Sequence, residues 1–127
     1  MAPKADAKAF GSLGLSEPLV RAVADMGYTD PTPIQVAAIP ALLQRRDVIG
    51  QARTGTGKTG AFVLPSLEIM LRTPTTRRAV RMLILTPTRE LAVQVAGEVG
   101  KMAAHANVRE LAVYGGASIE RQVRALR

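Results

Sequence analysis

The sequence predicts an α/β domain in which a parallel sheet is flanked by helices. The apolar run at residues 82–85, MLIL, is continuous rather than alternating, which is typical of a strand buried on both faces. A glycine- and threonine-rich loop at residues 52–59 lies between a predicted strand and a predicted helix. After two leading helices, strands and helices alternate, an order that implies parallel strands with right-handed crossovers. The length of 127 residues fits one domain.

The first part of the chain predicts an irregular lead-in followed by two helices. Residues 1–9 are small and polar and are expected to be flexible. Residues 16–18, Ser-Glu-Pro, indicate a helix start, and Gly27 indicates the end of that helix. Residues 32–33, Thr-Pro, repeat the start signal for a second helix, in which Pro40 is expected to cause a bend.

The remainder of the chain predicts three strands, each followed by a helix. Strands are expected at residues 47–52, 82–85 and 108–114. Helices are expected at residues 58–72, where Pro65 weakens the pattern, at residues 88–104, and around Ile119, Val123 and Leu126. The glycine pair that follows residue 114 ends the third strand.

Composition favours an anionic partner and excludes several classes of protein. The chain carries 17 Lys and Arg against 10 Asp and Glu, and its isoelectric point is about 10.8. An alternative explanation of this excess of positive charge is a base composition of the genome that favours Arg and Ala codons. With only two Phe, two Tyr and no Trp, a bound nucleic acid would be held by its backbone rather than by stacked bases. No apolar run is long enough to cross a membrane. The absence of Cys excludes disulfides and fits a cytoplasmic location.

The strongest chemical signal is ARTGTGKT at residues 52–59. It matches the phosphate-loop pattern G-x-x-x-x-G-K-[ST], except that Ala52 replaces the first glycine. The glycines let phosphate oxygens approach the backbone, and the next helix directs its positive end at them. Lys58 can reach phosphate oxygens, and the Thr59 hydroxyl can help to hold Mg²⁺. The competing interpretation is a glycine-rich turn that happens to precede Lys-Thr.

Three further segments fit the same chemistry. Residues 27–35, GYTDPTPIQ, end in a glutamine whose amide can pair with adenine N6 and N7, and Phe10 can stack on the ring. Taken alone, Gln35 is equally consistent with a solvated amide. PTRELA at residues 87–92 and VYGGAS at residues 113–118 follow predicted strands, where parallel sheets bind ligands.

Together these motifs resemble the first RecA-like domain of a DEAD-box RNA helicase. They correspond to the Q motif at residues 10–35, motif I at 52–59, motif Ia at 87–92 and the GG element at 115–116. The resemblance implies ATP or ADP binding with Mg²⁺ by Phe10, Tyr28, Gln35, Ala52, Arg53, Thr54, Gly55, Thr56, Gly57, Lys58 and Thr59. It implies contact with the RNA backbone, independent of sequence, by Pro87, Thr88, Arg89, Gly115 and Gly116. Arg53 and Thr56 depart from the commoner Gln and Ser.

The resemblance also implies that parts of the family's catalytic site are missing from this chain. No DEAD sequence occurs, so the chain is expected to be an N-terminal fragment that lacks the Mg²⁺-linked carboxylate, the catalytic Glu and the second RecA-like domain. Lys58 and Thr59 then contribute to ATP hydrolysis without completing a catalytic site. The alternatives are another phosphate-loop NTPase, such as a DNA helicase or a transporter ATPase, and a nucleic-acid-binding module whose loop is idle. His105 is interpreted as solvated or as a C-terminal helix cap, and Glu90 as structural unless it also orients Arg89. The RNA substrate and the oligomeric state stay open.

Overall fold

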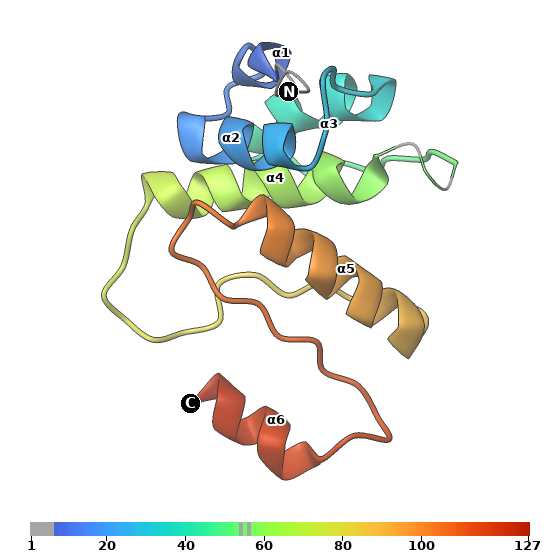
Figure 1. Ribbon diagram of the computed structural model, residues 1–127, viewed down its shortest axis with the longest axis vertical. Helices are drawn as coiled ribbons and strands as arrows, with labels where there is room; N and C mark the ends of the chain where they lie inside the picture. Colours follow the sequence, from blue (N-terminus) through green and yellow to red (C-terminus); the bar gives the residue numbers. More distant parts are fainter. Residues whose placement is uncertain (1–6, 54, 56) are drawn as a thin grey trace, which may run out of the picture.

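The structure, a computed structural model, describes residues 7–53, 55 and 57–127, and these residues form six α-helices (Figure 1). The helices are α1 (Lys8–Gly11), α2 (Glu17–Asp25), α3 (Pro33–Leu43), α4 (Lys58–Arg72), α5 (Arg89–Met102) and α6 (Ile119–Leu126). Within this described part of the chain, none of the helices is both long and apolar enough to cross a membrane.

Helix α4 is the centre of the fold. Figure 1 shows α2 and α3 along one side of α4 and α5 along the other, while α6 lies apart at the end of a long segment. The four central helices share one core, and removing its apolar side chains from water is the main stabilising contribution. Side chains with no exposed surface come from these helices, including Leu19, Val23, Ile39, Leu64, Leu67 and Met102, and also from α1, which contributes Phe10.

The predicted starts of α2, α3 and α4 are confirmed, whereas α1 forms within the lead-in that was expected to be irregular. Helix α2 begins after Ser16 with Pro18 in its first turn, and α4 has the predicted bounds. Gly27 ends α2 at a φ of +86°, where its N–H and that of Tyr28 bond the carbonyls of Ala24 and Val23. Pro40 lies inside α3, and the helix continues for three more residues before it ends.

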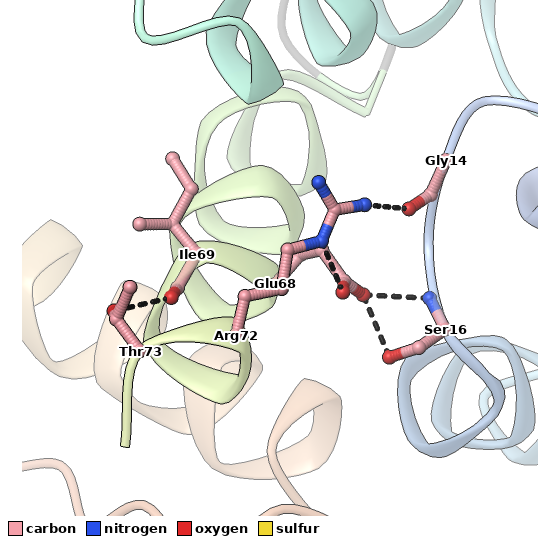
Figure 2. A network of polar contacts seen from close by, with 6 residues as sticks. All are labelled: Gly14, Ser16, Glu68, Ile69, Arg72 and Thr73. Carbon is pink, nitrogen blue, oxygen red and sulfur yellow. Dashed lines mark hydrogen bonds and ion pairs between the residues drawn. The ribbon is translucent and has the colours of Figure 1, made fainter. Parts of the chain in front are cut away.

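A buried carboxylate joins the N-terminal segment to α4 (Figure 2). Glu68 is 2% exposed, and its Oε1 accepts hydrogen bonds from the backbone N–H of Ser16 at 2.6 Å and from the Ser16 hydroxyl at 2.7 Å. Its Oε2 accepts from Nε of Arg72 at 3.0 Å, and Nη2 of Arg72 donates to the Gly14 carbonyl at 2.7 Å. The network fixes the connection between α1 and α2 against α4.

The three predicted strands are not confirmed. Residues 47–52, 82–85 and 108–114 form no strand in the part of the chain that the structure describes. Side chains nevertheless alternate: Met82 and Ile84 pack against the core, whereas Leu83 is 78% exposed and Leu85 is 86% exposed. A continuous apolar run predicts cover on both faces, but here helices cover one face and the other is open. A sheet also needs neighbouring segments paired by backbone hydrogen bonds, which these segments do not make.

Candidate functional site

A pocket lies beside the N-terminus of α4, where two segments that are distant in sequence meet. It measures about 280 Å³ and is lined from the turn by Gly27, Tyr28, Thr29, Asp30, Thr32 and Gln35, and from the loop by Gly55 and Gly57. The turn follows α2 and includes the first turn of α3, whereas the loop directly precedes α4. The structure therefore unites the two segments that the sequence predicts to recognise a base and to hold phosphates.

The loop has the backbone conformation that its glycines permit. Gly55 has a φ of +82° and Gly57 a φ of +83°, values that favour glycine, and Gly57 is the N-cap of α4. The free N–H groups of the first turn of α4 are therefore available to an anion beside the loop. Lys58 is exposed and Thr59 is half-buried in that turn, while Ala52 and Arg53 precede the loop. The predicted ligands Thr54 and Thr56 lie outside the described residues.

Gln35 is the physical link between the turn and the loop. Its side chain is almost fully buried, its Oε1 accepts a hydrogen bond from the N–H of Thr32 at 3.0 Å, and its Nε2 donates to the carbonyl of Gly57 at 3.1 Å. A Cβ at Gly57 would lie 2.5 Å from that Nε2, so the close approach requires glycine. The sequence predicts that this amide pairs with a base. In the structure, one lone pair of Oε1 and one hydrogen of Nε2 are already engaged by Thr32 and Gly57. One hydrogen and one lone pair remain for a ligand.

The pocket also contains an unsatisfied polar atom. The Thr32 hydroxyl faces the backbone N–H of Gln35 in a capping box at the start of α3, but among the described residues this buried oxygen has no close hydrogen-bond partner. A buried polar atom without a partner is unfavourable, and a bound polar ligand relieves that cost. Together with the remaining amide hydrogen of Gln35, this hydroxyl gives the wall of the pocket a donor and an acceptor, which fits a planar base that has both. The residues present therefore fit a nucleotide.

The two aromatic residues assigned to the base differ in access. Phe10 has no exposed surface, and its ring stacks on that of Tyr28 with centroids 6.4 Å apart and planes 24° apart. Tyr28 lines the pocket, so Phe10 supports the wall from behind, and its predicted direct contact with adenine has no support in this geometry. Burial, and then the charge of Glu98, raise the pKa of the Tyr28 hydroxyl above its usual 10.0, so the ring is neutral near pH 7.

A second hollow, of about 500 Å³, lies at the N-terminus of α5. Arg89, Glu90, Val93 and Tyr114 line it, and Nε of Arg89 contacts Oε1 of Glu90 at 3.3 Å. The Thr88 hydroxyl caps α5 by accepting a hydrogen bond from the N–H of Leu91 at 3.2 Å. Pro87, Thr88 and Arg89 are all exposed at this end of the helix.

The predicted GG element lies against this hollow. Gly116 has a φ of +84°, and a Cβ there would lie 3.2 Å from Nη1 of Arg89, whereas a Cβ at Gly115 would meet nothing within 4 Å. The structure thus brings Arg89 and the glycine pair together, as the sequence predicts. Their exposed backbone and cationic side chain suit a phosphate backbone.

Sequence reasoning missed one residue beside the second hollow and one that supports the fold, and it misjudged a third. Gln122 bonds the backbone of Tyr114, and Glu68 carries the network of Figure 2. Neither belongs to a motif, and no local pattern indicates a partner so distant in sequence. His105, interpreted as solvated or as a helix cap, pairs with Asp25: its Nε2 lies 2.6 Å from Oδ2, which connects the turn after α5 to the end of α2.

Comparisons of sequence and of fold relate the chain to known proteins. The profile of the DEAD/DEAH box helicase family matches residues 32–127. The chain is 49% identical over 118 residues to a DEAD-box ATP-dependent RNA helicase, CshA, of Bacillus cereus, covering 93% of this chain and 22% of the relative. It is 47% identical over 113 residues to the DEAD-box ATP-dependent RNA helicase RhpA of Helicobacter pylori, covering 89% of this chain and 22% of that protein. The chain thus spans about a fifth of the length of these relatives.

Two solved structures have a similar fold. The RNA-helicase Prp28 from Chaetomium thermophilum, bound to ADP, superposes with a TM-score of 0.81 at 45% identity, over 90% of this chain and 28% of that one. A DEAD box protein from the hyperthermophile Methanococcus jannaschii gives a TM-score of 0.78 at 37% identity, over 94% of this chain and 32% of that one. With the matching profile and the identities above, these likenesses establish that the chain belongs to the DEAD/DEAH box helicase family.

Proposed function

We propose that the chain binds ATP or ADP across the turn at residues 27–35 and the loop at residues 52–59. The observation that carries the proposal is the single pocket that both segments line, joined through Gln35. In this arrangement the free half of the Gln35 amide and the Thr32 hydroxyl face the base, and Tyr28 offers its ring. The N-terminus of α4 and Lys58 attract the phosphates, and Thr59 would hold the accompanying Mg²⁺. The relative Prp28 was solved with ADP bound, which supports the choice of ligand.

We propose in addition that residues 87–89 and the pair Gly115–Gly116 bind the backbone of single-stranded RNA. Arg89 supplies positive charge, and the exposed glycines allow close approach of the sugar-phosphate chain. The relatives CshA and RhpA are RNA helicases by name, which favours RNA over DNA as the ligand. The whole protein is proposed to be an ATP-dependent RNA helicase with a second RecA-like domain, in which residues 47–52, 82–85 and 108–114 complete a parallel sheet.

By itself the chain is proposed to bind nucleotide without hydrolysing it. Phosphoryl transfer needs a metal-linked carboxylate, a group that orients the attacking water and a cation placed on the transition state. The Asp of the DEAD sequence is absent here, and Asp47 and Glu68 do not fill its place: Asp47 precedes the loop, and Glu68 is buried in the network of Figure 2. An arginine finger alone accelerates such reactions by about 10³- to 10⁵-fold.

An assay of phosphate release tests this proposal directly. The chain is expected to bind a fluorescent ADP analogue that unlabelled ATP displaces, yet to release phosphate from ATP at the rate of buffer alone, with or without RNA. Turnover by the chain that Lys58→Ala abolishes would contradict the proposal. Failure of ADP to bind would favour the alternative, a nucleic-acid-binding module whose phosphate loop is idle.

Substitution of Arg89 by alanine is expected to weaken RNA binding to a similar extent for all sequences. Each phosphate neutralised on a single strand contributes about −0.7 to the slope of log affinity against log salt, so the slope should become shallower by less than about one unit. Filter binding of two oligoribonucleotides of different sequence across a salt series measures this. Arg21→Ala, an exposed change on α2, is the matched control and should leave the slope unchanged. A sequence preference that disappears with Arg89→Ala would refute backbone recognition.

A further inference from the structure

The side-chain amide of Gln122 acts as a clamp on the backbone of a single residue. Its Oε1 accepts a hydrogen bond from the N–H of Tyr114 at 3.0 Å, and its Nε2 donates to the carbonyl of the same Tyr114 at 3.3 Å. The second hydrogen of Nε2 reaches the carbonyl of Ser118 at 3.2 Å. Gln122 thus satisfies both backbone groups of Tyr114, as a neighbouring strand would, and adds a third bond on the far side of the turn.

These bonds close the turn that carries the glycine pair. Tyr114 precedes the turn, and Ser118 ends it by capping α6, where its Oγ accepts from the N–H of Arg121 at 3.3 Å. Between the two lie Gly115 and Gly116, which contribute no side chain to restrain the backbone. Glycine loses more conformational freedom on ordering than any other residue, so this turn depends on a brace from outside itself.

The position of the turn determines the second hollow. Tyr114 lines the hollow with Arg89, and the backbone of Gly116 approaches the Arg89 guanidinium, where a Cβ would lie 3.2 Å from Nη1. In the described part of the chain, α6 packs on no other helix, so the bonds of Gln122 tie α6 to this segment. Fixing Tyr114 therefore fixes the separation between the glycine pair and Arg89.

We infer that Gln122 is a positioning residue for RNA binding: it holds the turn at residues 115–118 at the spacing from Arg89 that a sugar-phosphate backbone requires. The inference rests on the proposed RNA-binding function and adds to it a residue that lies outside all four motifs. Gln122 need not contact RNA, because it acts by ordering the turn before the ligand arrives, which lowers the entropy lost on binding.

Two substitutions separate this role from a general effect on folding. Gln122→Ala removes all three bonds and is expected to weaken binding of a fluorescent oligouridylate about tenfold, with ADP affinity unchanged. Gln122→Glu keeps the shape but places a carboxylate against two carbonyl oxygens, and is expected to bind RNA equally weakly at neutral pH. Gln94→Ala, an exposed glutamine on α5, is the matched control and should bind both ligands as the unaltered chain does.

The RNA affinity of the Gln122→Glu variant is expected to depend on pH. A protonated carboxyl donates to the Tyr114 carbonyl and accepts from its N–H, so lowering the pH towards about 4–5, where glutamate takes up its proton, should restore RNA affinity in Gln122→Glu. The unaltered chain and Gln122→Ala, measured over the same range, remove the effect of other titrating groups. If Gln122 holds the turn as inferred, RNA affinity should recover at low pH in Gln122→Glu alone.

Three outcomes would overturn the inference. RNA affinity that stays unchanged in both variants would show that the turn needs no brace. Equal losses of ADP and RNA affinity would show a role in the whole fold instead. Failure of the unaltered chain to bind RNA would refute the proposed RNA site, and hydrogen exchange at the Tyr114 amide would still test the clamp, because Gln122→Ala should then speed that exchange if the bond exists.

Discussion

Lys58→Ala is expected to weaken ADP binding about 10- to 100-fold while leaving the fold intact. Lys58 is exposed at the first position of α4, beside the glycine loop, so its removal leaves no cavity. A hydrogen bond to a charged group contributes about 1.5–3 kcal/mol, and 1.4 kcal/mol corresponds to a tenfold change in affinity. The backbone N–H groups of α4 remain, so some affinity for phosphate should persist.

Isothermal titration with ADP measures the effect, and Lys101→Ala provides the control. Lys101 lies in the last turn of α5 and lines neither site, so its loss removes the same charge without the contact. Equal weakening by the two substitutions would mean that only net charge attracts the nucleotide. Unchanged affinity in Lys58→Ala would remove the loop from the binding site.

Glu68→Ala is expected to lower the free energy of unfolding by about 2–4 kcal/mol. The change deletes an acceptor that is 2% exposed and leaves the N–H and hydroxyl of Ser16 and Nε of Arg72 without their partner (Figure 2). Bonds to a charged acceptor contribute about 1.5–3 kcal/mol each, but Arg72 is half exposed and water replaces part of its loss. The expected total is therefore below the sum of three bonds.

Urea unfolding followed by circular dichroism measures this loss. Glu68→Gln keeps an oxygen that can accept from Ser16 but presents an amide to Arg72, so it should lose about half as much. Glu120→Ala, on an exposed residue of α6, should stay within about 0.5 kcal/mol of the unaltered chain. A Glu68→Ala variant as stable as Glu120→Ala would show that the network contributes nothing net.

The helices and the main pocket were predictable because their determinants are local. Residues 16–18 and 32–33 combine an N-cap with a proline, which is favoured in the first turn of a helix, and Gly27 supplies the positive φ that ends α2. The loop at residues 52–59 has the spacing of a phosphate loop, which the sequence shows directly. Gln35 was predicted to contact a base and lines the pocket, but its bond to Gly57 was not foreseen, because that bond depends on how α3 packs on α4.

The remainder depends on contacts between residues that are distant in sequence. Phe10 was assigned to the base, but the packing of α1 places it behind Tyr28. Glu68 has a partner 52 residues away. Gln122 stands between arginines in the sequence, and nothing in that segment indicates that its amide bonds the backbone of Tyr114. The predicted strands are not confirmed for the same reason: an apolar run indicates the preference of a segment, but a sheet forms only where neighbouring segments pair with it.

The turn at residues 27–35 and the phosphate loop are proposed to form a single site for an adenine nucleotide. The most direct test is the ratio of ADP to GDP affinity, measured by titration for the unaltered chain and for Gln35→Ala. The ratio removes any effect that the substitution has on Gly57 and the loop, because the two nucleotides share their phosphates. A good bidentate contact to the base is worth about 1–3 kcal/mol, so ADP should bind about 5- to 150-fold more tightly than GDP, and Gln35→Ala should bring the ratio close to one. Equal affinity of the unaltered chain for ADP and GDP would contradict the claim, as would a preference for ADP that Gln35→Ala leaves intact.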